Sequence, residues 1–500
     1  MRPDRLLARC ALPLMLAGCA TSALDMAPSQ PDRPWTPPIN ASGEIIPGAK
    51  PLPSADGASY ELPTNSKLAS VPTPPAIDQD QPYTLAGLID IAQSSNPLTR
   101  TAWNNAREAA LAAGIVRSAY LPKLTASVVR GHVNTHDDID TTGNGTISAL
   151  SLQWLLFDFG QREALNNVAQ QGSVIANIAF TAAHQQVIHD VSLAFYAHAA
   201  ARARVETALR SLQNAGAVQA AAEERFAHDI GTVIEVAQAR QGTAQAKLLE
   251  VQAEGAAQDT YLALISAMGI SPLTQMRIAG IADRKLPVAA SDSIESIVAE
   301  ALGRRPDVLA AYAAQAASLE NVRAAKAEFL PKFFVSATGA YNDGRLDVTA
   351  LPSIGQQLPT VNLSENRHGV TIFAGVTVPI YDGGTRAATL RQAQAKADNA
   401  ALALTRTQEE AVRQIVVAEN GLRTSLAAHD AASSLASAAQ TTFDAALEAY
   451  RNGVGSITDV TVAETQVLQA RNAFTDAHST ALSAAATLAL AAGALGSVPR

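Results

Sequence analysis

The feature that most constrains the fold of this chain is an internal duplication. Residues 84–123 align with residues 293–332 without a gap, at an offset of 209. Farther along the offset becomes 224, so that the segment Phe157–Arg162 corresponds to Tyr381–Arg386. The second copy therefore holds 15 additional residues (224 − 209), which fall between Lys332 and Tyr381. A period this long indicates two fused copies of one structural unit, because solenoid repeats are only about 20–50 residues long.

Long stretches without proline predict two long helices, one in each copy. Proline is absent from Lys123 to Ser271 and from Ile380 to Val498, and proline is what breaks helix interiors. The helical windows Gln161–Ala227 and Thr385–Arg451 are 67 residues each. Each would be about 100 Å long at 1.5 Å per residue. Turns containing glycine follow at 228–232 and 452–456, so each copy is expected to form an antiparallel hairpin, at 160–268 and 384–493.

The apolar positions of these windows favour coiled-coil-like packing. Val187, Val191 and His198 lie on one stripe at helical spacing, with small alanines between them. Charged residues make up 16% of the chain and aromatic residues 5%, so thin helix-rich layers suit it better than a thick core. The net charge of −8 disfavours nucleic-acid binding, which needs a basic surface. A soluble coiled-coil protein remains an alternative interpretation of the helices alone.

Between the first helix of each copy and its long helix lie short alternating segments that predict strands. We expect β-hairpins over 121–157 and 330–381, with a polar loop from His136 to Gly145 in the first. Leu150, Leu152 and Trp154 would share one face of such a strand. Four strands are too few to close a barrel with a lumen, and lipid does not tolerate an open sheet edge. If the strands cross a membrane, several protomers must share one barrel; a soluble hairpin packed on helices is the alternative.

The amino-terminus is typical of a bacterial lipoprotein signal. Arg2, Arg5 and Arg9 precede a short apolar segment that ends in Leu16-Ala17-Gly18-Cys19. We expect a signal peptide over 1–18, with a covalent diacylglycerol and an N-palmitoyl chain on Cys19 as the only attached groups. A chance cysteine in a plain signal peptide is the alternative. Residues 19–82 are rich in proline and predict an extended arm. The two copies then occupy 83–291 and 292–500.

The order of these motifs resembles the TolC family of outer-membrane efflux and secretion channels, in particular its lipoprotein members. The resemblance covers roughly 83–495 and rests on short motifs that recur in both copies: Tyr120–Lys123, Phe157–Gly160, Arg304–Asp307, Phe329–Lys332, Val378–Gly384 and Tyr450–Gly453. It implies a membrane α+β fold, in which a homotrimer builds a 12-stranded β-barrel from four strands per protomer. The barrel would continue into a long α-helical barrel in the periplasm, with a mixed belt near 272–300.

The same resemblance implies a passive exit duct of a tripartite efflux or secretion system. Its partners would be a periplasmic adaptor protein, an inner-membrane transporter and outer-membrane lipid. Type I protein secretion, rather than small-molecule efflux, is one alternative; a non-conducting coiled-coil lipoprotein is another. No catalytic motif is evident, and His184 and His189, five residues apart, do not have the spacing of a metal site on one helix face. We therefore expect neither enzymatic activity nor a metal.

The family pattern also implies the roles of particular residues at the turns between long helices. Gate candidates are Glu235, Arg240, Tyr450 and Asp459. Adaptor-docking candidates are Gly231, Thr232, Gly455 and Ser456. Two positions depart from the family: a second acidic residue is replaced by Val462, and an arginine partner of Tyr450 by Gly455. For each charged candidate an ordinary solvated helix-end charge is the alternative, and for each glycine a simple requirement of the turn.

Overall fold

The computed structural model describes residues 22–28, 30–32, 34–53, 60–69, 77–78, 80–136, 140–281, 284–286, 293–344 and 368–495. Cys19 and the expected signal peptide lie outside the described residues. The chain divides into two compact units, Met1–Pro75 and Ala76–Arg500. The first contains the short 3-10 helix η1 (Ser22–Met26) and a bridge between Ile39 and Ile45.

The second unit begins before the expected end of the proline-rich arm at residue 82. Strand β1 (Pro82–Tyr83) pairs in parallel with β4 (Arg277–Ile278), and the backbone N–H of Asp78 donates to the Tyr83 hydroxyl at 3.0 Å. These contacts tie the last residues of the arm to the body of the second unit.

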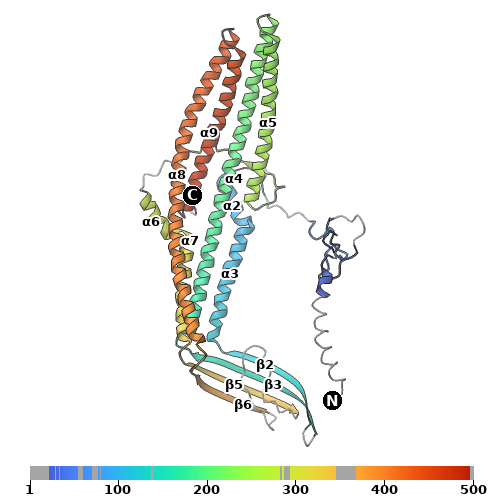
Figure 1. The fold of residues 1–500 in the computed structure, drawn as a ribbon, viewed down its shortest axis with the longest axis vertical. Helices are drawn as coiled ribbons and strands as arrows, with labels where there is room; N and C mark the ends of the chain where they lie inside the picture. The colour runs from blue at the N-terminus through green and yellow to red at the C-terminus, as the bar shows by residue number, and fades with distance from the viewer. Residues whose placement is uncertain are drawn as a thin grey trace, which may run out of the picture. The chain divides into compact units, whose positions relative to one another are not determined.

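Two long helical hairpins dominate the second unit (Figure 1). The first consists of α4 (Gln161–Ala227) and α5 (Val233–Ala267), and the second of α8 (Thr385–Arg451) and α9 (Ile457–Ala491). The bounds of α4 and α8 agree with the helical windows predicted from the sequence. None of the described helices is long and apolar enough to cross a membrane.

Shorter helices precede each sheet segment and brace the long ones. In the first copy these are α2 (Leu85–Ser95) and α3 (Pro97–Arg117), followed by the 3-10 turn η2 (Ser118–Tyr120). In the second copy they are α6 (Ile294–Arg304) and α7 (Pro306–Ala327). Helix α4 packs against α3, α5, α7 and α9, whereas α8 packs against α7 and α9. The two hairpins therefore meet mainly through α4 and α9.

The four long strands form one antiparallel sheet in the order β2-β3-β5-β6. They are β2 (Lys123–His136), β3 (Asp140–Phe157), β5 (Lys332–Gly344) and β6 (His368–Thr377). The expected loop from His136 to Gly145 is wrong in extent, because the β2–β3 ladder continues to the pair His136 and Asp140. Backbone pairing needs no apolar side chains, so the polar sequence concealed the first residues of β3, from Asp140 to Gly145.

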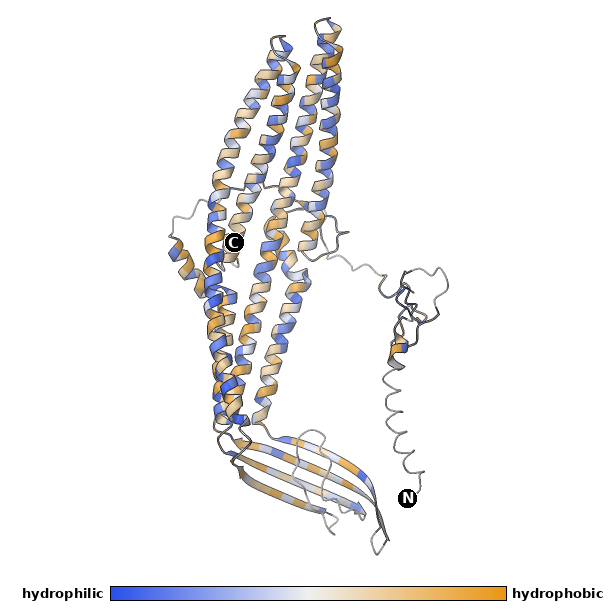
Figure 2. Ribbon diagram, in the orientation of Figure 1, coloured by the Kyte–Doolittle hydropathy of each residue, from blue (hydrophilic) through white to orange (hydrophobic). Residues whose placement is uncertain are grey.

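The register gives the sheet one apolar face. Leu150 pairs with Gly339, Leu152 with Ala337 and Trp154 with Val335, and Gly339 and Ala337 pair in turn with Val370 and Ile372. The face predicted from alternation in single strands is thus continuous across β3, β5 and β6. Several of its side chains are exposed in this single chain: Leu124, Val128, Leu150, Trp154, Val370 and Ile372. The alternation along the strands is visible in Figure 2.

The opposite face of the sheet carries most of its polar side chains, together with the apolar side chains of Ile147, Phe334 and Phe373. Thr338 Oγ1 donates to Ser151 Oγ across the β3–β5 pair at 3.4 Å, and Gln153 and Thr371 belong to the same face by register. An apolar face opposite a polar face is the pattern of strands that separate lipid from water.

The connection from sheet to long helix is built twice from the same parts. Arg162 Nε lies 3.0 Å from Asp158 Oδ2, and its Nη1 donates to the carbonyls of Leu155 and Ala119 at 2.6 and 3.1 Å. In the second copy Arg386 Nε lies 2.8 Å from Asp382 Oδ2 and Nη1 donates to the Pro379 carbonyl. In each copy an arginine satisfies carbonyls near the end of the strand, while an aspartate accepts from a backbone N–H in the first turn of the helix.

The far ends of α5 and α9 also return to equivalent places. Asn96 Nδ2 donates to the Ala267 carbonyl at 3.1 Å, and Arg305 Nη1 donates to the Ala491 carbonyl at 2.7 Å. Both side chains stand between two short helices and cap the carboxyl end of a long one, where carbonyls lack partners. Arg305 is thereby a structural residue, which also pairs with Asp307 at 2.7 Å.

Candidate gating and docking site at the helix tips

The turn at the tip of each hairpin requires its glycine. The N–H groups of Gly231 and Gly455 donate to the carbonyls of Arg225 and Ala449, both at 3.0 Å. A Cβ on Gly231 would lie 2.8 Å from the backbone nitrogen of Phe226, and one on Gly455 would lie 3.1 Å from Ala449 Cβ. The turn folds back so closely on the end of the helix that any side chain would displace it. Both glycine candidates are therefore needed for the turn itself.

The other two docking candidates and two gate candidates form capping boxes together. Thr232 caps α5, because the backbone N–H of Glu235 donates to Thr232 Oγ1 at 3.2 Å and the N–H of Thr232 donates to Glu235 Oε2 at 3.1 Å. Ser456 and Asp459 make the same reciprocal pair at the start of α9. Each box satisfies helix N–H groups that would otherwise lack partners. The spacing Thr-x-x-Glu and Ser-x-x-Asp after each turn is the sequence signal for this arrangement.

Arg240 pairs within its own hairpin. Its Nη2 and Nε lie 2.9 and 3.0 Å from Glu223 Oε1 on α4. These hydrogen bonds, together with one from Gln219, hold the pKa of Glu223 below its ordinary value. The pair is exposed to solvent, and such pairs contribute little to stability. In this conformation Arg240 does not reach the second hairpin.

Tyr450 is the gate candidate that lies between the hairpins. Its side chain is fully buried, the guanidinium of Arg225 lies 5.0 Å from the centre of its ring, and Arg225 Nη1 donates to its carbonyl at 3.2 Å. Burial, followed by the negative charge of Glu235, raises the pKa of Tyr450. Glu235 and Tyr450, which come from different copies, are thus close enough to interact.

Sequence reasoning missed Arg225. It supplies the arginine that the family pattern led us to seek at Gly455, and it comes from α4 instead. Its counterpart in the second copy is Ala449, and the next residues, Phe226 and Tyr450, are also equivalent. A charged residue in one copy opposite an alanine in the other, beside a gate candidate, was the signal in the sequence. Two buried polar atoms at this contact, Arg225 Nε and the Tyr450 hydroxyl, have no hydrogen-bond partner among the described residues.

An apolar cluster beneath the tips holds the hairpins together. It includes Val218 and Ala222 of α4, Phe443 of α8 and Val460 and Val467 of α9. Small side chains dominate it, so the helices approach closely while little apolar area is buried per residue.

The outermost residues of the tips expose apolar side chains. Ile230 and Val454, which occupy equivalent positions in the two turns, are 64% and 83% exposed. Val233 and Ile234 at the start of α5 are exposed as well. These residues lie at the two tight turns, so each tip presents an apolar end to solvent.

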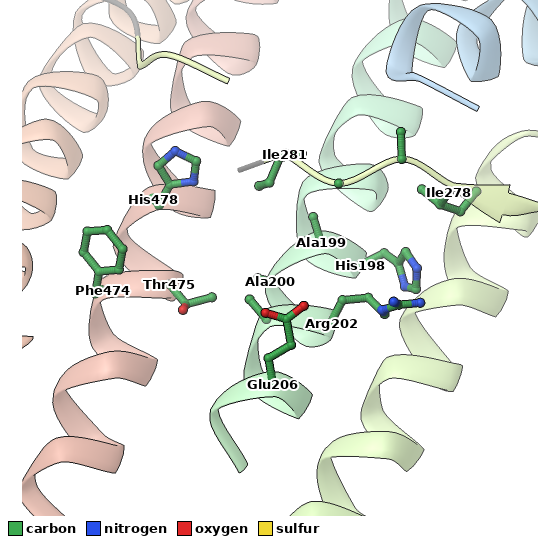
Figure 3. A pocket seen from close by; sticks show the side chains of 13 residues that line it. His198, Ala199, Ala200, Arg202, Glu206, Ile278, Ile281, Phe474, Thr475 and His478 are labelled. Carbon is green, nitrogen blue, oxygen red and sulfur yellow. The ribbon is translucent and has the colours of Figure 1, made fainter. Parts of the chain in front are cut away.

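A separate cavity of about 370 Å³ lies farther down, between α4, α9 and the segment that contains Ile278 and Ile281. In Figure 3 His198 and Arg202 lie on one side of it, whereas His478 and Phe474 lie on the other. Burial lowers the pKa of both histidines. Within the described residues, no group of three or more His, Cys, Asp or Glu side chains could hold a metal ion.

Comparisons with known proteins agree on one family. A model of the outer membrane efflux protein family matches residues 88–270 and 297–494. The protein CyaE of Bordetella pertussis is 26% identical over 435 residues, which is 85% of this chain and 87% of CyaE. The outer membrane protein OprJ of Pseudomonas aeruginosa is 25% identical over 74% of this chain and 75% of OprJ.

Solved structures share the fold. The outer membrane protein VceC of Vibrio cholerae superposes with a TM-score of 0.68 at 21% identity, over 82% of this chain and 96% of VceC. The two segments that the family model matches lie one in each copy, at 88–270 and 297–494.

Proposed function

The chain belongs to the outer membrane efflux protein family, and on that premise we propose that it is the passive exit duct of a tripartite system, through which an inner-membrane transporter exports its substrates. The observation that carries the proposal is the joining of a four-stranded sheet to two long helical hairpins in one duplicated unit. A duct needs a continuous wall, and in both copies the Asp–Arg contacts at the junction join the sheet directly to a long helix. No step of bond chemistry is required of the protein.

Three copies of the chain would complete the wall. Among the described strands, β2 and β6 each have one pairing partner and leave an outer edge free. A free edge facing lipid is not tolerated, whereas pairing β2 with β6 of a neighbouring copy would close a 12-stranded barrel. The exposed apolar face of the sheet would then meet lipid, and the face with Ser151 and Thr338 would line the lumen.

The helix tips would form the gate and the adaptor-docking site. In the state described here Arg225 and Tyr450 hold the two hairpins of one protomer together. Opening would break this contact and bring the two unpartnered polar atoms into water, which lowers its cost. The exposed apolar ends at Ile230 and Val454 offer a surface on which a periplasmic adaptor could bind and pull the hairpins apart.

Cys19 would anchor the amino-terminus to the outer membrane through a diacylglycerol and an N-palmitoyl chain. The proposal rests on the segment Leu16-Ala17-Gly18-Cys19 behind a basic, apolar start. Labelled palmitate should be incorporated into the natural chain and not into Cys19→Ser. Label that persists in the variant would rule out this attachment site.

Recording in planar bilayers tests the duct directly. The purified full-length protein should conduct weakly at rest, and the current should rise in Tyr450→Ala and in Arg225→Ala, because either change removes the contact between the hairpins. Arg423→Ala is the matched control, because Arg423 is exposed and contacts only residues of its own helix among the described residues, Glu419 at 3.9 Å and Asn420. If folded, trimeric protein carries no current in any variant, the chain is a non-conducting structural lipoprotein instead.

A further inference from the structure

The seam between α4 and α9 is crossed by a series of polar contacts that join the two hairpins. They are His189 with Thr487 at 3.2 Å, Ser479 with the Tyr196 carbonyl at 2.9 Å, Arg204 with Asp476 at 2.6 Å, and Ser211 with Glu464 at 3.2 Å. The contact nearest the tips of these four is the one between Ser211 and Glu464. It is also the one that places an acidic group in the seam without a basic partner.

The carboxyl group of Glu464 lies in a restricted environment. Ser211, which donates to Glu464 Oε1, is itself buried, and Ala463 and Val467 on either side of Glu464 belong to the apolar cluster beneath the tips. Burial raises the pKa of Glu464, and the hydrogen bond from Ser211 opposes this in part. Glu464 is only partly exposed, so a carboxylate here would have a single protein donor and reduced contact with water, which is costly for a charge.

The equivalent position in the first copy has an ion pair that Glu464 lacks. Its counterpart in the first copy is Arg240, which is exposed and paired with Glu223 across the α4–α5 hairpin. The residue equivalent to Glu223 is Leu447, so no opposite charge stands across the α8–α9 hairpin. The side chain at position 464 turns instead to Ser211 on the other hairpin. One position thus joins two helices of the same hairpin in one copy and two different hairpins in the other.

The charged groups on the surrounding helices interact with residues other than Glu464. On α5, Arg240 pairs with Glu223, and Lys247 pairs with Glu250. Arg471 of α9 donates to Gln440 of α8 at 2.6 Å, and the charges that act on it are Arg210 of α4 and Asp444 of α8. None of these side chains has a hydrogen bond or ion pair with Glu464 among the described residues.

We propose that the contact of Glu464 with Ser211 is a proton-sensitive contact that holds the two hairpins together. With a protonated carboxyl group Glu464 stays in the seam on Ser211 and the tips remain together. When it ionises, the carboxylate draws water into the seam and favours separation of α9 from α4. The consequence for conduction rests on the proposed function, whereas the response of the seam itself to protons does not.

Hydrogen–deuterium exchange of the full-length trimer at several pH values tests this inference. Protection of peptides 211–222 and 457–470, corrected for the chemical exchange rate at each pH, should fall as the pH rises. The opening constant should change by up to about tenfold per pH unit if one proton is linked to opening. Peptides from 85–117 are the internal reference. Glu464→Gln keeps the size of the side chain without the charge and should show no pH-dependent change in the seam.

Two further variants make the result specific. Ser211→Ala removes the donor that favours the ionised form, so the transition should move to higher pH. Glu224→Gln removes an exposed charge on α4 and should behave as the natural protein does. Equal pH dependence in the natural protein and in Glu464→Gln would overturn the proposal even if bilayer current were present. If the protein carries no bilayer current but the seam still responds to pH, the proposed duct function is contradicted and the proposed role of Glu464 is supported.

Discussion

The two ends of the duplicated unit differ in how closely the copies agree. At the sheet end, Asp158 with Arg162 and Asp382 with Arg386 make the same contacts with helix and strand. At the tips the turns and capping boxes agree, but the side chains that join helices do not: Arg225 corresponds to Ala449, Glu223 to Leu447 and Arg240 to Glu464. The comparison teaches that the copies kept what fixes the wall and diverged where the hairpins meet.

The largest loss of stability is expected at the sheet end, where the two junctions should differ in the cost of losing their arginine. Arg162→Ala leaves Asp158, whose side chain is 6% exposed, as an unpaired buried charge, and such a loss costs about 3–5 kcal/mol. Arg386→Ala should cost less, because Asp382 is 32% exposed and water can replace its partner. The temperature at which the trimer loses helical circular dichroism measures both. Equal losses would mean that the two junctions are not distinguished by burial.

At the tips the ring of Tyr450 and its hydroxyl should have opposite consequences. Tyr450→Ala removes a fully buried ring and should cost about 3–5 kcal/mol of unfolding free energy locally. Tyr450→Phe removes a buried hydroxyl that has no partner and should be neutral or slightly stabilising. Protease cleavage at the tip, as a function of denaturant, compares the two. A Phe variant as unstable as the Ala variant would show that the hydroxyl has a partner in solution.

The two tip turns should respond alike to a methyl group, which sharpens the agreement between the copies. Gly231→Ala and Gly455→Ala place a Cβ against the helix end at 2.8 and 3.1 Å. Each should cost more than about 1 kcal/mol, as substitutions incompatible with the local backbone do, with the closer contact at residue 231 costing more. The same protease assay applies, with Gly242→Ala, where a Cβ meets nothing within 4 Å, as control. A control variant that is as sensitive as the turn variants would contradict the requirement.

The smallest effect is a pH dependence of the cavity between α4 and α9. Burial lowers the pKa of His198 and His478 below the ordinary value of about 6.5. Their neutral forms are favoured in the folded state, so stability is full above about pH 6.5 and is lost as the pH falls through the folded-state pKa values. Thermal unfolding between pH 7.5 and 5.5 should show this loss, and His198→Gln should reduce it. Glu464 acts with the opposite sign, so the two effects separate in single variants.

The sequence predicted the architecture well because its signals there are cumulative. Proline-free windows and alanine-rich stretches located α4 and α8 to the residue, and alternation located the faces of β3 and β6. The first residues of β3 were not predicted from the sequence, because strand pairing at polar residues leaves no periodic pattern.

The tip was less predictable. The capping roles of Glu235 and Asp459 were readable from their three-residue spacing after Thr232 and Ser456. The contact between Arg225 and Tyr450 joins residues 225 positions apart, and no local pattern reports on such a pair.

Cross-linking across the outer strands would show whether copies of this chain share one barrel wall. Single cysteines placed along β2 from Lys123 to Gly131 and along β6 from His368 to Thr377 would be combined in pairs and oxidised in membranes. A shared barrel should give covalent trimers on denaturing gels for one antiparallel register, with links at alternating positions, because paired side chains alternate between faces. Membranes that yield no such link in any register, from protein that is folded and inserted, would contradict it.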